Sequence, residues 1–350
     1  MLRNLLSRAG VRVLLAAASG VLAFGLPPAR AERLESPLEL LHAPGNLLVA
    51  GPLLEANVKG RLVFGRGEVL GGNGKPPPKI DVRAPQAAIQ RVQVGRHYIF
   101  GYSTARPDPR NPTRTIADPA GAILLTSTGL DPALFDDTPA ARAILKAGGS
   151  EHRRESRRFF DLLMKALAGP DPQLQNLAVG EIALEPEIGA RLDDRARAAI
   201  AKVALDPAVA PGVRATLLSS AAARPRELGQ WWSAAAVKIL ETTPVDGYAA
   251  KASDPTDLVL VAFEVTGAHA VDIPATVLRR WVRSASPALV ERACLALRRQ
   301  SPAAERSAIA QALADPALPA RTRKFLDGHL HRLDRLDGRN GARKDSTNRS

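Results

Sequence analysis

The stretch GSEHRRESRRFFDLLMKALAGPDP, residues 149–172, decides how the chain must be divided. Before it, the sequence has the short apolar runs and glycine turns that are typical of β-strands. Within it, apolar residues recur with the spacing of one buried α-helical stripe, at Phe159, Leu162, Leu163, Ala166 and Leu167. The sequence therefore predicts an α+β protein, in which a small β domain is followed by a helical domain.

Helical periodicity continues to about Leu336, and the predicted helices come in pairs. Further stripes include Ala196, Ala199, Ile200, Val203 and Ala204, then Trp232, Ala235, Ala236, Ile239 and Leu240, then Val277, Leu278, Trp281 and Val282. Several pairs are divided by a step at which Asp or Ser can cap a following helix and Pro suits its first position. These steps are Asp171-Pro172, Asp206-Pro207, Asp254-Pro255, Ser286-Pro287 and Asp315-Pro316, spaced by 35, 48, 32 and 29 residues. Such irregular spacing predicts a degenerate array of helical hairpins.

The Ala-rich helix pairs with Asp-Pro turns, from Glu151 to about Leu336, resemble HEAT-type repeats. Tetratricopeptide repeats would keep a stricter period of about 34 residues and an aromatic signature that this sequence lacks. The resemblance implies an α-solenoid with a curved surface that binds another macromolecule.

Between about Leu47 and Leu130, five or six short strands predict a small barrel or sandwich. This part resembles the OB-like barrel of small exported bacterial modules through 60–63 (GRLV), 68–70 (EVL) and 94–100 (VGRHYIF). Related barrels in netrin-like and metalloproteinase-inhibitor modules depend on cysteines. Because this β part has none, their inhibitory chemistry is not expected here.

The first 31 residues predict a cleaved secretory signal peptide. Arg3, Arg8 and Arg12 precede an apolar run over 13–26, and Ala29-Arg30-Ala31 offers small residues at the cleavage positions. The run is shorter than the roughly 20 residues of a transmembrane helix, so we expect cleavage after Ala31 and an exported, periplasmic or secreted protein with no membrane span. The predicted order is a signal peptide (1–31), an OB-like β domain (32–130), a linker with a helix near Thr138–Lys146 (131–150), a HEAT-like array (151–336) and a disordered basic tail (337–350).

The formal net charge is +13, or +9 once Arg3, Arg8, Arg12 and Arg30 are removed with the signal peptide. A basic excess can indicate an anionic partner. The chain, however, contains 38 Arg against 10 Lys together with many Ala and Pro residues, a bias that codon supply in a GC-rich genome would also produce. The single cysteine, Cys294, excludes an intramolecular disulfide and a Cys-clustered zinc site.

Familiar catalytic signatures are missing from the sequence. In 65–70 the third glycine of a GxGxxG motif is replaced by Leu70, and GxxxxGK[ST], HExxH and GxSxG do not occur. His329 and His331 would point about 200° apart on a helix, so we expect one half-buried and one exposed histidine rather than a shared metal. Cys294 is expected to be buried and inert. No catalytic, cofactor-binding or metal-binding residue is predicted.

The strongest prediction about a site is a basic surface on the last repeats. Arg279, Arg280 and Arg283 lie off an apolar stripe, and later hairpins add further cations that could join them in one ridge. The candidate partner-binding residues are Arg279, Arg280, Arg283, Arg298, Arg299, Arg321, Arg323, Lys324 and Trp231, of which Trp231 could instead fill a repeat junction. The four arginines Arg153, Arg154, Arg157 and Arg158 could likewise pack against the barrel or face an acidic partner.

These observations favour a non-enzymatic binding or scaffolding protein that engages a protein partner in the periplasm. Two alternatives stay open: an envelope hydrolase with a site at the domain interface, and a binder of an anionic envelope polymer. No cofactor and no nucleic-acid partner are expected.

Overall fold

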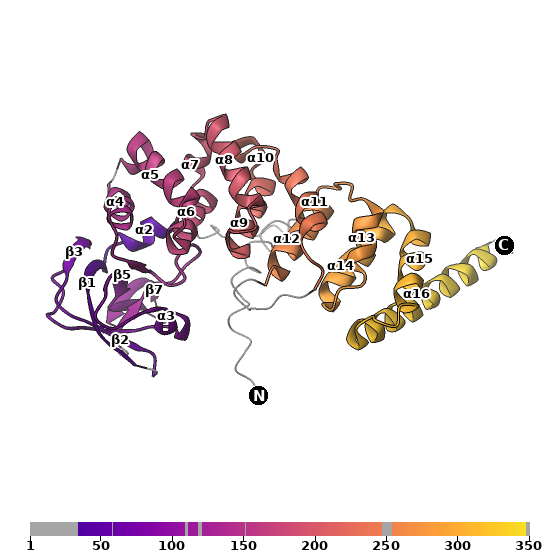
Figure 1. Ribbon diagram of the computed structural model, residues 1–350, viewed down its shortest axis with the longest axis horizontal. Coiled ribbons are helices and arrows are strands. Elements are labelled where there is room, and N and C mark those ends of the chain that lie inside the picture. The colour runs from indigo at the N-terminus through magenta and orange to yellow at the C-terminus, as the bar shows by residue number, and fades with distance from the viewer. Residues whose placement is uncertain are drawn as a thin grey trace. The chain divides into compact units, whose positions relative to one another are not determined.

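The computed structural model describes residues 34–347 except 58, 109–110, 118–120, 151 and 247–253, with backbone only for 105–120 and 336–347 (Figure 1). The chain divides into two compact units between Ile188 and Gly189, and each unit is described by itself. The division falls later than the predicted end of the β domain, because the first helices pack within the first unit. The predicted signal peptide lies outside the described residues.

In the first unit, five strands close a barrel, which settles the choice between barrel and sandwich. The closed order is β1–β2–β4–β8–β5, with β5 pairing back to β1. Only the β4–β8 pair is parallel among these five, and this connectivity fits an OB-like barrel. The five strands are β1 (Asn46–Asn57), β2 (Arg61–Phe64), β4 (Ile80–Arg83), β5 (His97–Ser103) and β8 (Ala122–Leu124). Two more strands extend the sheet: β3 (Glu68–Gly71) pairs with β1, and β9 (Leu134–Asp136) pairs with β5.

The barrel core explains the aromatic strand in the sequence. Phe64 on β2 stacks on Phe100 of β5 with ring centroids 3.8 Å apart, and both are fully buried. Gly67 needs to be glycine, because a Cβ there would lie 2.4 Å from the Ala50 carbonyl oxygen. The glycines of 65–67 therefore allow close strand packing.

The proline-rich segment that follows β5 forms two strands, although its composition is typical of a loop. Its backbone forms an antiparallel ribbon of β6 (Ala105–Asp108) and β7 (Asn111–Ala117), apart from the main sheet. A two-stranded ribbon has only edge strands, and these tolerate proline because an edge leaves half of the backbone N–H groups unpaired.

Helices cover the barrel in the first unit. Helix α2 packs against α4, α6 and β1, and α4 packs against β3 and α5. Their bounds are α2 (Pro37–Leu41), α3 (Gln86–Arg91), α4 (Pro139–Gly148), the 3₁₀ turn η1 (Arg153–Glu155), α5 (Arg157–Ala168), α6 (Pro172–Leu184) and α7 (Pro186–Ala190). The helix predicted near Thr138–Lys146 is α4.

The second unit is an array of helix pairs, which Figure 1 shows from α8 to α16. The pairs are α8–α9, α11–α12, α13–α14 and α15–α16, with a short α10 between the first two. Their second helices form one continuous row, because α9 packs on α12, α12 on α14 and α14 on α16. The bounds are α8 (Asp194–Leu205), α9 (Pro211–Ala223), α10 (Pro225–Leu228), α11 (Trp232–Thr242), α12 (Thr256–Ala268), α13 (Ala275–Trp281), α14 (Pro287–Gln300), α15 (Pro302–Leu313) and α16 (Ala320–Thr347).

The first and last pairs of this unit repeat one another at a separation of 109 residues. Buried Ile200 corresponds to buried Ile309. Arg214 donates to the carbonyl of Ala204 at the end of α8, and its counterpart Arg323 donates to the carbonyl of Leu313 at the end of α15. The shared arginine contact satisfies a carbonyl that a helix end leaves without a partner.

The Asp-Pro steps do not all cap helices as the sequence predicts. Asp171 caps α6 through the amides of Gln173 and Leu174, as expected. Asp206 and Asp315 instead accept an amide two residues on, within turns that precede α9 and α16 by several residues. Asp254 likewise accepts the amide of Thr256 and is not the N-cap of α12. The prediction is wrong for these three steps, because an Asx turn competes with a helix N-cap for the same side chain. Ser286 lies at the N-cap of α14 but makes no side-chain cap bond.

The predicted disordered tail also differs from the structure. Helix α16 runs to Thr347, so the segment from Asp337 is helical as far as it is described. No proline interrupts α16, and the buried Leu326 and Leu333 anchor its first turns. Extending an established helix costs less than nucleating one, so the tail continues it without an apolar stripe of its own. No helix among the described residues is long and apolar enough to cross a membrane.

Candidate binding surface

The two halves of the predicted basic ridge meet where α13 ends and α16 begins. The Thr322 hydroxyl donates to the Ser284 carbonyl oxygen at 2.7 Å, and both residues are buried. Arg283 lies 3.3 Å from the Asp315 carboxylate, just before α16. The fold therefore brings residues about forty positions apart in the sequence to one place on the array.

Several of the predicted ridge arginines serve packing instead. Arg280 donates to the carbonyls of Leu240 and Thr243 at the C-terminal end of α11, and its guanidinium lies 5.5 Å from the Trp281 ring centroid. Arg323 donates to the carbonyls of Leu313 and Asp315 at 2.6 Å each. Both cations sit at the carbonyl end of a helix, where the helix dipole favours positive charge.

Arg298 and Arg299 also have partners inside the unit. Arg298 binds Glu305 through two hydrogen bonds, Nε to Oε2 at 2.7 Å and Nη2 to Oε1 at 2.9 Å. Arg299 donates to the Gly267 carbonyl at 2.7 Å. These contacts join α14 to α15 and to α12, so both side chains hold neighbouring helices together.

Three predicted cations are left for an external partner: Arg279, Arg321 and Lys324. All three are exposed, and none has a hydrogen bond or an ion pair with the described residues. Arg321 and Lys324 are three residues apart on α16 and therefore share a face. We call Arg279, Arg321 and Lys324 the open basic set. The side chain of Arg283 is half exposed, but it is paired with Asp315 and is not part of this set.

The two adjacent tryptophans behave differently. Trp232 is buried on the apolar stripe of α11, as the sequence predicts. Trp231 is half-buried and donates its indole N–H to the Leu228 carbonyl at 2.8 Å. It therefore fills the junction between α10 and α11 and does not form part of an exposed aromatic patch.

In the first unit, two of the four clustered arginines are used internally. Arg154 lies 2.8 Å from the buried carboxylate of Glu185, and Arg153 lies 3.9 Å from it. Arg157 and Arg158 are exposed at the start of α5. These two arginines therefore pair with Glu185, the C-cap residue of α6, rather than packing against the barrel or being left for an acidic partner.

The same region buries a second carboxyl group, Glu181 on α6. Its Oε1 accepts the amide N–H of Leu38 at 2.6 Å, and no hydrogen bond with the described residues reaches its Oε2. Burial raises the pKa of Glu181 to about 7, because it outweighs the stabilising Leu38 amide and the nearby charge of Arg153. This carboxyl group joins helix α2 to α6 and does not line either of the two clefts described below.

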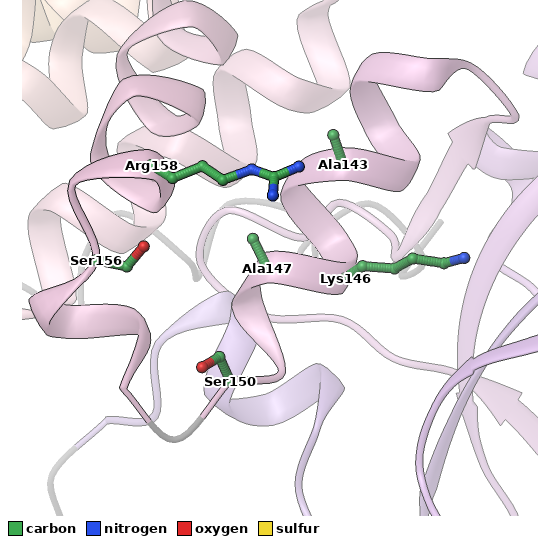
Figure 2. Close-up of a pocket in the computed structure, with 6 residues that line it drawn as sticks. All are labelled: Ala143, Lys146, Ala147, Ser150, Ser156 and Arg158. Carbon is green, nitrogen blue, oxygen red and sulfur yellow. The ribbon is translucent and has the colours of Figure 1, made fainter.

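A cleft of about 370 Å³ lies between α4 and the start of α5 (Figure 2). Figure 2 shows the Arg158 side chain extending toward α4, whereas the Lys146 side chain, on α4, points away from Arg158. Lys146 forms an ion pair with Glu68 at 3.1 Å. The described lining consists of Ala143, Lys146, Ala147, Ser150, Ser156 and Arg158, a set without a histidine, cysteine or carboxylate for acid–base or nucleophilic chemistry.

A second cleft, of about 270 Å³, lies between β5, β9 and the start of α6. Its charged groups are held by one another or by the backbone. Arg91 donates to the Leu134 carbonyl at 2.9 Å, Arg96 lies 3.7 Å from Asp136, and Asp171 caps α6. Burial lowers the pKa of Arg91 against the opposing charges of nearby aspartates. Among its described lining residues, neither cleft has a nucleophile paired with a general base, as a hydrolase requires.

One cluster was missed by sequence reasoning. Cys294 of α14, Glu305 of α15 and His329 of α16 are buried together, with their donor atoms within 4.8 Å of one another. The predicted burial of Cys294 and exposure of His331 are confirmed, whereas His329, predicted to be half-buried, is buried. In the sequence, Glu305 looks like an ordinary surface carboxylate of α15. Only the packing of three helices shows that its side chain is buried beside Cys294 and His329.

Comparison with known proteins identifies no family for this chain. No family model matches the chain, and neither a curated protein nor a solved structure matches it.

Proposed function

We propose that the protein is an exported, non-enzymatic binding or scaffolding protein whose helical array engages a protein partner in the periplasm. The observation that carries this proposal is the continuous row of second helices α9, α12, α14 and α16. Stacked helix pairs of this kind present an extended surface, and such surfaces commonly bind proteins. The HEAT-type reading of the array and the export of the chain are parts of the same proposal.

The open basic set is the proposed contact region. Arg279, Arg321 and Lys324 combine exposure with freedom from internal ion pairs, whereas most of their basic neighbours are tied to carbonyls or carboxylates. Unpaired cations contribute little to folding, so they are free to steer and orient an acidic protein surface.

The test replaces Arg279, Arg321 and Lys324 together with Gln in the exported chain. The wild type and the variant are used to capture partners from the envelope fraction of the producing cell, and each captured protein is then purified and titrated against both. We expect the triple variant to keep its melting temperature and to lose a partner whose binding to the wild type weakens as salt rises.

A matched control replaces three exposed cations at the first helix of the array with Gln: Arg191, which precedes α8, and Arg195 and Lys202 on α8. This control has the same net charge as the test variant and should retain the partner. Equal loss in both variants would point to non-specific attraction, as for an anionic polymer, and equal retention would reject the contact region.

A further inference from the structure

The buried cluster of Cys294, Glu305 and His329 has the geometry of an ion site. One side chain comes from each of three successive helices, α14, α15 and α16, and the three donor atoms lie within 4.8 Å of one another. Relative exposures are 0% for Cys294, 1% for Glu305 and 8% for His329. His329 Nε2 already lies 2.9 Å from Glu305 Oε1, which is close to the separation of two ligands on one metal ion.

The donor set restricts which ion could bind. A thiolate sulfur, an imidazole nitrogen and a carboxylate oxygen are the ligand types that zinc and similar transition ions accept. Calcium and magnesium require oxygen ligands, and this cluster offers them one carboxylate only. The chemistry therefore favours a thiophilic divalent ion.

The first helix pair of the same unit shows that a helix pair does not need these polar groups. At the positions that correspond to Glu305 and His329, the pair α8–α9 carries Ala196 and Ser220. Both pairs nevertheless share the buried isoleucine and the arginine contact at the helix end. Burying a carboxylate and an imidazole costs desolvation, so their presence in the last pair alone calls for a separate reason.

Arg298 holds the cluster in its ion-free arrangement. Its Nη2 lies 2.9 Å from Glu305 Oε1 and 3.2 Å from His329 Nε2, while its Nε binds Glu305 Oε2. Its side chain is 36% exposed, so it links the buried cluster to solvent. A metal ion on the Cys294 side would require the Arg298 guanidinium to withdraw from Glu305 Oε1 and His329 Nε2, so Arg298 competes with the ion for these two atoms.

We propose that Cys294, Glu305 and His329 form a binding site for a divalent transition ion of the zinc type, which would brace the last three helices of the array. On binding, the Cys294 thiol loses its proton to solvent, and the proton on His329 Nε2, which hydrogen-bonds Glu305 Oε1, moves to Nδ1, from which Arg332 withdraws. The sulfur, the carboxylate oxygen and Nε2 then each form one bond to the ion. One thiolate and one carboxylate then balance the two positive charges of the metal, and Arg298 remains as the outer cation. This proposal is independent of the proposed partner binding.

The direct test titrates the whole exported chain with Co²⁺, which reports sulfur ligation by a thiolate-to-metal absorption band. We expect one Co²⁺ per chain, displacement of the band by Zn²⁺, and a Zn²⁺-dependent rise in melting temperature. Below the thiol pKa, affinity should rise about tenfold per pH unit, because binding releases one proton. Absence of the band at saturating Co²⁺ would overturn the proposal.

Two substitutions separate an ion site from a purely structural network. Cys294→Ala should abolish the band and weaken Zn²⁺ binding by at least about 100-fold, because a ligand matters more than an outer-shell group. Arg298→Gln removes the competing cation and should tighten Zn²⁺ binding by at least about tenfold. If the cluster were only an ion-pair network, Arg298→Gln would lower stability and leave Zn²⁺ without effect.

Exposed His331 provides the matched control. His331→Gln should keep the band, its intensity and the Zn²⁺-dependent melting shift. Circular dichroism of every variant without metal establishes that it is folded. A melting shift that persists in folded Cys294→Ala, or that disappears in His331→Gln, would place the ion elsewhere and reject the site.

Discussion

Glu181 in the first unit and Glu305 in the second are both almost completely buried, at 0% and 1% exposure, yet their surroundings differ. Glu305 has both oxygens bonded, by the guanidinium of Arg298 and by His329. Glu181 receives one amide N–H at Oε1, while no described bond reaches Oε2. Burial raises the pKa of Glu181 to about 7, because the Leu38 amide and the nearby charge of Arg153 only partly offset the loss of water. The two buried carboxyl groups therefore differ in how many donors replace the water that burial removes.

The largest expected effect is the pH dependence of the first unit. Because the folded pKa of Glu181 is raised from 4.5 to about 7, its contribution to stability is complete below pH 4.5 and is lost as pH rises through 7. A shift of this size corresponds to about 3 kcal/mol of unfolding free energy. Glu181→Gln should match the wild type near pH 4 and be more stable by up to about that amount at pH 8.

Hydrogen exchange at the Leu38 amide, which donates to Glu181, measures this effect locally. In the wild type the amide should lose protection between pH 5 and pH 8, after correction for intrinsic exchange, whereas Glu181→Gln should hold it. Comparison with the variant also cancels the opposing contribution of His42, whose pKa is lowered mainly by burial. If the protection of this amide changed with pH equally in the two proteins, ionisation of Glu181 would have no cost in stability.

The fully bonded carboxylate should respond to loss of its charge partner instead. Glu305→Ala leaves the Arg298 guanidinium without its two charged hydrogen bonds. We expect a loss of about 2 kcal/mol, less than for a fully buried pair because the Arg298 side chain is about a third exposed. Urea unfolding followed by tryptophan fluorescence measures the second unit, since all three tryptophans, Trp231, Trp232 and Trp281, belong to it.

Glu291→Ala supplies the control for that measurement, because Glu291 is an exposed carboxylate on α14 and has no described ion pair. Its substitution should change stability by less than about 0.5 kcal/mol. Equal effects of Glu305→Ala and Glu291→Ala would show that the buried network contributes nothing to folding.

The sequence predicts the parts of this structure that depend on periodicity. The stripe Phe159–Leu167 places the change from strand to helix, and the aromatic run 97–102 becomes the central barrel strand β5. The pairing of β4 with β8, which closes the barrel, joins segments separated by the β5–β7 region and leaves no local signal. The course of α16 beyond Asp337 likewise follows from helix propagation and not from an apolar pattern.

The candidate site was predictable only as a group of cations, not as a set of contacts. Arg279 and Arg280 are adjacent in the sequence, yet one is exposed and the other reaches the carbonyls at the C-terminal end of α11. The contact that Arg280 makes depends on where the backbone oxygens of another helix pair lie, and the pattern of side chains in the sequence does not predict this. The meeting of Cys294, Glu305 and His329 depends on helix packing in the same way.

A smaller effect on stability is expected from the arginine contact that the first and last helix pairs share. Arg214 and Arg323 each satisfy the carbonyl end of the preceding helix, but Arg214 is the more deeply buried, and burial lowers its pKa. We expect Arg214→Gln to cost about 2 kcal/mol and Arg323→Gln about 1 kcal/mol, because a lost bond costs more where water cannot replace it. Fluorescence-detected urea midpoints rank the two, and a reversed order would mean that exposure does not set the cost.

The smallest expected effect distinguishes the adjacent arginines of the predicted ridge. Arg279→Gln should change unfolding free energy by less than about 0.5 kcal/mol, since this exposed side chain has no described partner. Arg280→Gln should cost about 1 kcal/mol, because it removes the bond to the Thr243 carbonyl and the contact with the Trp281 ring. Thermal unfolding at low and high salt checks both changes. The cost at Arg280 should persist in high salt, because its partners are uncharged and buried. If Arg279→Gln proved the more costly substitution, Arg279 would be a packing residue, and the open basic set would lose its central member.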